Sequence, residues 1–271
     1  MKQYALLVRT AETESDDALL VKKLLISSVD FLNRLSGKDL IGGRPDRNGF
    51  NLHFRKPSAP FLYYRLLEVL LYPLEVRGGM SSGNRLEEIL EKAAEALDHP
   101  LAGLLMNSGG KTDQYLNQFF RLRNEIRDYP TIQANLVQLF SELLFPLLAD
   151  CRALQNSDMI ARLSLILKFK REYFEHLKSN KPSNRFYSHL FPEIDYAKYG
   201  ELIGTSEPDQ KEEGDGFPMI RENYWKKGFS TKVSLILGIT RQIIDRNYKY
   251  LNYANLRNLD ATIVHYLLDN Y

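Results

Sequence analysis

Cysteine, strong net charge and long apolar runs are all scarce in this sequence. Its 271 residues include one cysteine, Cys151, and carry a formal net charge of +2. A single thiol excludes an intramolecular disulfide and is typical of a protein in a reducing compartment. No apolar run reaches the roughly 20 residues of a membrane-spanning helix, and the N-terminus lacks the pattern of a secretion signal. We therefore expect a cytoplasmic protein with no membrane partner.

Clusters of metal-binding or nucleophilic residues are missing as well. No serine or cysteine triad has a local signature, and the histidines lack paired spacing. The five histidines are His53, His99, His176, His189 and His265. Unless the fold brings distant residues together, the sequence predicts no metal, no cofactor, no catalytic residues and no enzyme activity. Because the net charge is small, any affinity for nucleic acid must come from a local basic cluster.

The most informative stretch, residues 230–246, has the pattern of a helix-turn-helix. That motif needs a short helix with a small inner residue, a glycine at the turn, an apolar residue after it and a second helix. Ser234, Gly238 and Ile239 meet the first requirements, and the hydroxyl of Thr240 can cap the second helix. A glycine joint is also common in all-helical proteins, so the motif alone leaves both interpretations open.

Basic residues around this stretch favour DNA. From residue 221 onward the chain has eight Lys and Arg residues against four Asp and Glu residues, an excess that suits a phosphate backbone. We expect Trp225 to be a core aromatic, while Ile243, Ile244 and Tyr248 pack inward from the second helix. The predicted DNA-binding residues are Lys226, Lys227, Lys232, Thr240, Arg241, Gln242, Arg246 and Lys249.

Apolar patterns in the first hundred residues predict a domain of strands and helices. The predicted strands are 4–9, 40–43, 49–54 and 74–80, of which the middle two form a hairpin with its turn at 44–48. The predicted helices lie between residues 15 and 37, at 59–71 and at 85–97. The order strand, helix, strand, strand, helix, strand is that of ferredoxin-like domains.

This order is also the core of class III nucleotide cyclases, and two short motifs resemble theirs. Residues 49–54 and 76–83 occupy the places of the cyclase hairpin strand and glycine-bearing strand. Cyclase chemistry needs one carboxylate from the first strand and one from the hairpin to hold two metal ions. Here Arg9 ends the first strand, Asn48 stands at the hairpin position, and Asp46 lies two residues early. We therefore expect a cyclase-like fold without metal catalysis.

A narrower resemblance spans the whole chain. Bacterial SatD-type proteins are similar in having a cyclase-like α/β half, a helical middle and a C-terminal helix-turn-helix introduced by a tryptophan. The similarity rests on residues 49–54, 76–83 and 225–246. The chain departs from that family at the hairpin, which usually carries a glycine, an aspartate and a glutamate before its phenylalanine. The resemblance implies a DNA-associated regulatory protein.

The glycine- and serine-rich segment at 78–83 allows a second kind of site. It resembles a turn ahead of a helix, with Arg77 and Arg85 on either side, and the amides of such a turn can cradle a phosphate. No Walker spacing or dinucleotide fingerprint is present, so a tight structural turn is the alternative. The residues of the candidate anion or nucleotide site are Arg77, Gly78, Gly79, Ser81, Ser82 and Gly83.

Helical spacing continues through residues 112–180 and produces three apolar stripes, which indicate a core or a dimer seam. The first stripe is Tyr115, Phe119, Leu122 and Ile126. The second lies at 136–148 and the third at 160–177, where Lys170 interrupts the apolar face. We expect the stem of Lys170 to lie along that face while its ammonium group reaches water.

The acidic segment at 204–216 is poor in apolar residues and predicts an exposed linker. After the helix-turn-helix, residues 256–268 predict a closing helix capped by Asp260. The predicted class is α+β. The predicted parts are a ferredoxin-like, nucleotide-cyclase-like domain (1–110), a helical region (111–200), the acidic linker (201–217) and a helix-turn-helix DNA-binding domain (218–271).

These features lead to one main hypothesis and one alternative. The main hypothesis is a DNA-binding transcriptional regulator whose cyclase-like domain senses a ligand, such as a small nucleotide, or mediates assembly. Its partner would be double-stranded DNA, and we expect a homodimer because one helix-turn-helix makes few base contacts. In the alternative, the α/β half binds a nucleotide or signal, or acts as an enzyme, and the helical tail is a protein-protein adaptor.

Overall fold

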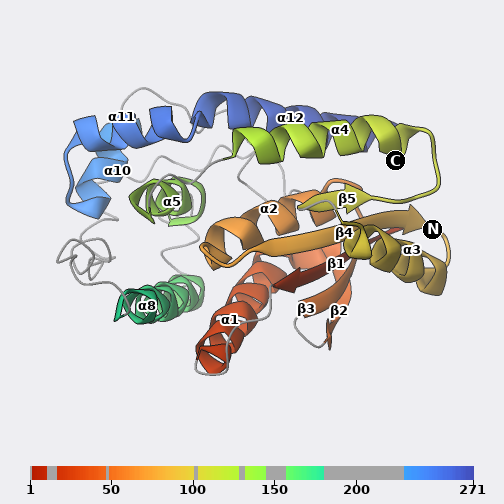
Figure 1. Ribbon diagram of the computed structural model, residues 1–271, viewed down its shortest axis with the longest axis horizontal. Coiled ribbons are helices and arrows are strands. Elements are labelled where there is room, and N and C mark those ends of the chain that lie inside the picture. Colours follow the sequence, from red (N-terminus) through yellow and green to blue (C-terminus); the bar gives the residue numbers. More distant parts are fainter. Residues whose placement is uncertain are drawn as a thin grey trace. The chain divides into compact units, whose positions relative to one another are not determined.

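The structure is a computed structural model that describes residues 2–10, 17–46, 49–100, 103–127, 132–144, 157–179 and 229–271. The chain divides into two compact units. The first unit contains Met1–Glu14, Leu32–Asp128 and Asn252–Tyr271, and the second contains Ser15–Phe31 and Tyr129–Leu251. The described strands all belong to the first unit, whereas the described elements of the second unit are helical (Figure 1). The predicted α+β class is confirmed.

The first unit is built on one five-stranded sheet. Its strands are β1 (Gln3–Thr10), β2 (Leu40–Asp46), β3 (Gly49–Phe54), β4 (Val76–Gly83) and β5 (Leu104–Met106). They lie in the order β2-β3-β1-β4-β5, and all neighbours are antiparallel except β4 and β5, which are parallel. The first four strands were predicted. The fifth was not, because three residues are too few to show an alternating pattern.

The predicted hairpin of β2 and β3 is present, but β2 is longer than expected. The register pairs Pro45 with Phe50 and Asp46 with Gly49, so Arg44, Pro45 and Asp46 belong to the strand and the prediction of a turn there is wrong. A proline fits in β2 because β2 is an edge strand, where one side of the backbone needs no ladder hydrogen bond.

Two helices cover opposite faces of the sheet, α2 (Ala59–Leu71) and α3 (Leu86–Asp98), both close to their predicted positions. Successive residues of a strand point to opposite faces. A Cβ atom at Gly78 would lie 2.7 Å from the Tyr64 ring of α2, and one at Gly79 would lie 1.9 Å from the Ala93 carbonyl oxygen of α3. The two adjacent glycines of β4 therefore allow the close approach of a helix on each side.

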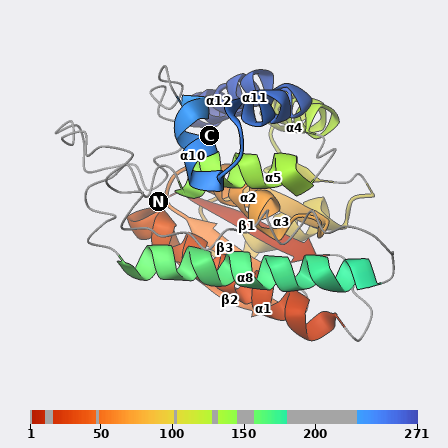
Figure 2. The same cartoon turned by 90° about the vertical axis from the view of Figure 1, so that its left-hand side faces the viewer.

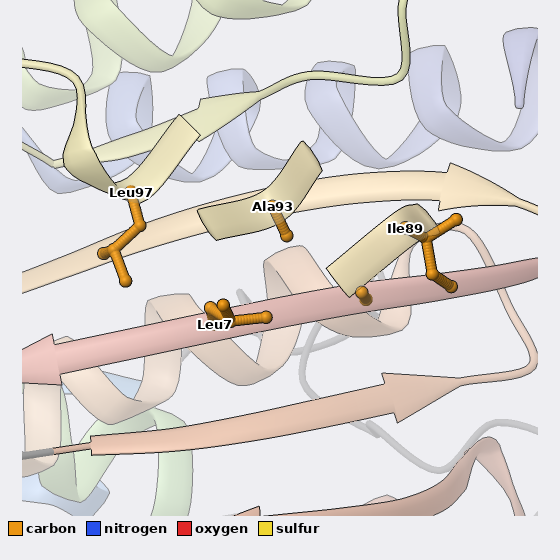
Figure 3. Packing of buried hydrophobic residues seen from close by; sticks show 5 residues of the cluster. Leu7, Ile89, Ala93 and Leu97 are labelled. Carbon is orange, nitrogen blue, oxygen red and sulfur yellow. The ribbon is translucent and has the colours of Figure 1, made fainter. Parts of the chain in front are cut away.

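The face under α3 has a compact apolar core. Ala5 and Leu7 of β1 pack against Ile89, Ala93 and Leu97, which recur on one side of α3 at helical spacing. Figure 3 shows the labelled side chains of α3 and Leu7 of β1 facing one another. Because α3 packs closely over Leu7, the neighbouring residue of β4, Gly79, can carry no side chain on this face.

We expect Gly79→Ala to destabilise the protein by about 1–3 kcal/mol or more, because its methyl group would overlap the backbone of α3. Urea unfolding followed by circular dichroism measures this effect. Gly110→Ala is the control, since its nearest neighbour would be the flexible Thr112 side chain at 3.3 Å. Equal stability of the two variants would contradict the close packing of α3 on β4.

A buried charge cluster joins α2 to α4 (Thr112–Ile126) and α12 (Tyr253–Asn270) within the first unit. Arg123 donates hydrogen bonds to Oδ1 of Asp260 at 2.7 Å and to Oε2 of Glu68 at 2.7 Å. Arg65 also donates to Asp260, and Arg127 forms an ion pair with Glu68. Burial lowers the pKa of Arg123, but Glu68 and Asp260 raise it by more. Burial likewise raises the pKa of Asp260, but the two guanidinium groups lower it by more.

The predicted capping role of Asp260 is wrong. The helix α12 begins at Tyr253, and Asp260 lies in its middle with 1% of its surface exposed. The helix starts earlier than predicted because Asn252, at its N-cap position, adopts the left-handed conformation (φ 47°) that separates it from the preceding helix. Asp260 therefore binds arginines from two other helices instead of backbone amides.

The second unit is helical throughout its described part. Its elements are α5 (Ile132–Leu139), the π-helix η2 (Phe140–Leu144), α8 (Ser157–Ser179), α10 (Phe229–Leu237) and α11 (Arg241–Tyr250). The helix α1 (Ala18–Ser36) contributes its residues up to Phe31 to this unit and is followed by a short 3-10 helix, η1 (Gly37–Asp39), of the first unit. Figure 2 shows α8 along its length. The second and third predicted stripes supply buried residues, among them Leu136, Leu139, Phe140, Leu163 and Ile166.

Lys170 departs from its prediction. Its side chain is 0% exposed, so the ammonium group does not reach water, and burial holds the pKa of Lys170 well below its usual value. Its Nζ atom lies 5.7 Å from the centre of the Phe174 ring. The third stripe therefore buries the amine together with the apolar stem.

Candidate nucleic-acid interface

The predicted pair of helices with a glycine between them is present as α10 and α11. Gly238 follows α10 with φ at 63°, a left-handed conformation that favours glycine. The amide of Ile239 donates to the carbonyl oxygen of Ser234 at 3.2 Å, which closes the end of α10. Ser234 is buried, as expected for a small inner residue.

The second helix begins at Arg241, directly after Thr240. Thr240 has an extended backbone (φ −68°, ψ 147°), and its carbonyl oxygen accepts hydrogen bonds from Ile243 at 3.0 Å and Ile244 at 3.3 Å. Its side chain makes no capping hydrogen bond, so the predicted role of the hydroxyl is wrong. The backbone conformation at the N-cap position starts the helix, and the residue itself lies exposed at the surface.

The α11 helix has a clear division between its faces. Ile244, Asn247 and Tyr248 are buried, Ile243 is half-buried, and the polar residues predicted to face solvent do so. Tyr250 is also exposed, and it lies next to Arg246 because the two residues are one helical turn apart. It is not among the DNA-binding residues predicted from the sequence. The exposed residues of this face are Arg241, Gln242, Asp245, Arg246, Lys249 and Tyr250.

The inner side of α11 is fixed by contacts within the second unit. The hydroxyl groups of Tyr248 and Ser141 are 2.6 Å apart, and Ser141 donates to the carbonyl oxygen of Val137 at 2.6 Å. Asn247 donates from Nδ2 to the Ile243 carbonyl oxygen at 2.8 Å. The Tyr248–Ser141 contact holds one side of α11 against η2, and α11 also packs against α5, so the opposite side faces solvent.

The exposed face of α11 is positively charged. It carries Arg241, Arg246 and Lys249 against one carboxylate, Asp245. Arg241 Nε lies 3.4 Å from Asp245 Oδ2, an exposed pair one helical turn apart. Such pairs contribute little to stability, so Arg241 can exchange Asp245 for another anion at small cost.

The structure does not describe how the remaining predicted DNA-binding lysines lie relative to this face. Lys232 belongs to α10, the helix before the turn at Gly238, but its side chain is outside the described part of the structure. Lys226 and Lys227, together with Trp225, fall outside the described residues, and so do Cys151 and the predicted linker at 201–217.

The candidate anion site is not a turn. The residues from Arg77 to Gly83 lie in β4, between β1 and β5, so the prediction of a turn is wrong. Backbone amides in an interior strand serve the ladder, and the glycines serve the packing of α2 and α3. Arg77 donates to the carbonyl oxygen of His99 at the end of α3. The binding of an anion by these residues stays an untested prediction.

At the end of β1, the guanidinium group of Arg9 faces two carboxylates. Its Nη1 atom lies 3.0 Å from Asp98 Oδ1, and its Nη2 atom lies 3.6 Å from Asp46 Oδ2. Asp46 is thus paired with an arginine. Within the described ranges, no group of three or more His, Cys, Asp or Glu residues is arranged to hold a metal ion. Across that same part of the chain, each helix is too short or too polar to span a bilayer.

Comparisons with protein-family models and with curated proteins found no match for this chain.

Proposed function

We propose that the protein is a DNA-binding transcriptional regulator that contacts DNA through the exposed face of α11. The observation that carries this proposal is the division of α11 into a packed inner side and a solvent-exposed side with Arg241, Gln242 and Arg246. Arginine and glutamine side chains form paired hydrogen bonds with guanine and adenine edges, and arginine and lysine also bind phosphates. The left-handed glycine between α10 and α11 supports a helix-turn-helix.

The sheet of the first unit supports a ferredoxin-like, cyclase-like domain with a sensory or assembly role. The antiparallel order β2-β3-β1-β4, with a helix between β3 and β4, is the arrangement expected for the split βαβ unit. Arg9 at the end of β1 puts a positive charge where the cyclase reaction needs a carboxylate, and it lies within ion-pair distance of Asp46. These residues favour a non-catalytic role, consistent with the resemblance to SatD-type proteins.

The proposal predicts the effect of removing two charges from α11. We expect Arg241→Ala with Arg246→Ala to weaken DNA binding at least about 30-fold, because each arginine that contacts a base contributes about 1–3 kcal/mol. The slope of log K for DNA association against log salt concentration should also fall in magnitude by about one or two, one for each phosphate that the variant no longer neutralises. Fluorescence anisotropy with labelled genomic fragments, at several salt concentrations, measures both quantities.

A matched control removes two exposed positive charges elsewhere. Lys22→Ala with Lys168→Ala changes the net charge equally but leaves α11 intact. The wild-type affinity should be retained in this variant. The proposal fails if the wild type binds no DNA, or if the α11 variant and the control variant have equal affinity.

A further inference from the structure

One apolar stripe of the first unit is not used in the core. In α4, the side chains of Tyr115 and Leu122 are 60% and 45% exposed. Phe119 lies between them and Ile126 lies one turn after Leu122, and both are half-buried. The buried residues of α4 are instead Asp113, Leu116, Phe120 and Arg123. The helix therefore has two faces of different kinds: one packs inward with the buried charge cluster, and the other is apolar but lies at the surface.

The stripe continues onto α12. The rings of Phe119 and Tyr266 meet edge to face with centroids 5.5 Å apart, and Tyr266 donates to the carbonyl oxygen of Thr112 at 3.3 Å. Figure 1 shows α4 and α12 side by side. Leu259, half-buried, lies two turns before Tyr266 on the same side of α12. We name these six residues the α4–α12 surface: Tyr115, Phe119, Leu122, Ile126, Leu259 and Tyr266.

The spacing of the α4–α12 surface suits other helices. On α4 the residues follow one another at intervals of four, three and four, and on α12 at an interval of seven. These intervals are the heptad spacing of helices that pack side by side with interlocking side chains. Two such helices from each of two partners would complete a four-helix arrangement.

The charges around the surface indicate the partner. Its exposed neighbours include four uncharged residues, Gln114, Gln118, Asn255 and Thr262, and one charge of each sign: Lys111, four residues before Tyr115, and Asp269, three residues after Tyr266. At one margin Arg121 and Glu125 form an ion pair at 3.0 Å, so both signs are present in equal number. In a twofold dimer the same patch meets itself, and a patch of one sign would repel its copy. Because positive and negative charges are equal in number around the α4–α12 surface, two copies of this surface can meet without net repulsion.

We infer that the α4–α12 surface is the docking site for a second copy of this chain. The anchoring of α12 by the buried charge cluster gives this surface a fixed shape, since Asp260 is bound by arginines of both α2 and α4. This inference concerns assembly and does not depend on DNA binding by α11.

Sedimentation velocity of the full chain tests the inference. We expect the wild type to form dimers at micromolar concentration, and Tyr115→Glu with Leu122→Glu to weaken dimerisation at least about 100-fold, because two exposed apolar contacts are replaced by repelling charges. Circular dichroism checks that the variant keeps its helices. The double variant should remain folded, since both side chains are largely outside the core.

Two further tests separate docking from general damage. Leu19→Glu places the same charge at a leucine that is 65% exposed on α1, and it should leave dimerisation unchanged. A mixture of Leu122→Glu and Leu122→Lys variants should associate more tightly than either variant alone, because opposite charges then meet across the twofold axis. A monomeric wild type, an unaffected double variant, or loss of dimer in Leu19→Glu alone would overturn the inference.

Discussion

Asp260→Asn is expected to lower the free energy of unfolding by about 3–5 kcal/mol, because it removes one charge from a buried group of ions and leaves the others without compensation. Asp260 accepts hydrogen bonds from both Arg65 and Arg123, and the side chains of all three are almost fully buried. Asparagine has nearly the same shape, so the variant creates little cavity. The destabilisation therefore reports the charge itself.

The matched control is Asp269→Asn, an exposed position on the same helix. A surface change of this kind should alter stability by less than about 0.5 kcal/mol. Urea unfolding at neutral pH, followed by circular dichroism, gives both values. If Asp260→Asn is no more costly than Asp269→Asn, the buried charge cluster does not hold α12 to α2 and α4.

Local patterns in the sequence identified most elements of the fold. A short apolar run located β1, alternation located β3, and helical spacing located α1, α2 and α3 within a few residues. The turn at Gly238 and the outward direction of Arg241, Gln242 and Arg246 were also predicted, because an amphipathic helix of ten residues contains the information about its own faces. These features depend on neighbours in the sequence.

Features that depend on distant residues were not predicted. An aspartate ahead of an apolar run has the pattern of a helix cap, but the partners of Asp260 are Arg65 and Arg123, which are 195 and 137 residues away. A run rich in glycine and serine has the composition of a turn, yet in β4 the glycines admit α2 and α3. Composition alone does not distinguish a loop from a strand that two helices approach closely.

The same limit explains why the sequence left open whether each apolar stripe belongs to the core or to a dimer seam. Periodicity indicates that a face avoids water, and it does not indicate what covers that face. On α8 the stripe is buried so completely that Lys170 is enclosed with it, whereas on α4 the stripe of Tyr115 and Leu122 lies outside the core. The core of the first unit instead uses Arg123, whose charge is compensated by carboxylates from two other helices.

Lys170→Met is expected to stabilise the protein at neutral pH and to reduce the dependence of its stability on pH. Burial alone lowers the pKa of Lys170 in the folded protein, so folding at neutral pH must either release its proton or bury its charge. Methionine has a similar unbranched shape and no such cost. The gain should be largest at neutral pH and should vanish as the solution approaches the pKa of an unfolded lysine, about 10.4.

The direction of this pH dependence follows from the number of protons that the folded and unfolded chains bind. Between the lowered folded pKa and the unfolded pKa, the unfolded chain binds one more proton at this position than the folded chain, so wild-type stability rises with pH by about 1.4 kcal/mol per unit. Lys170→Met lacks this contribution, while Lys168→Met, at an exposed position on the same helix, should keep it. The comparison uses urea unfolding of the three proteins between about pH 7 and pH 10. Parallel pH profiles for Lys170→Met and Lys168→Met would show that the amine is charged and solvated in the folded state, which contradicts its burial on α8.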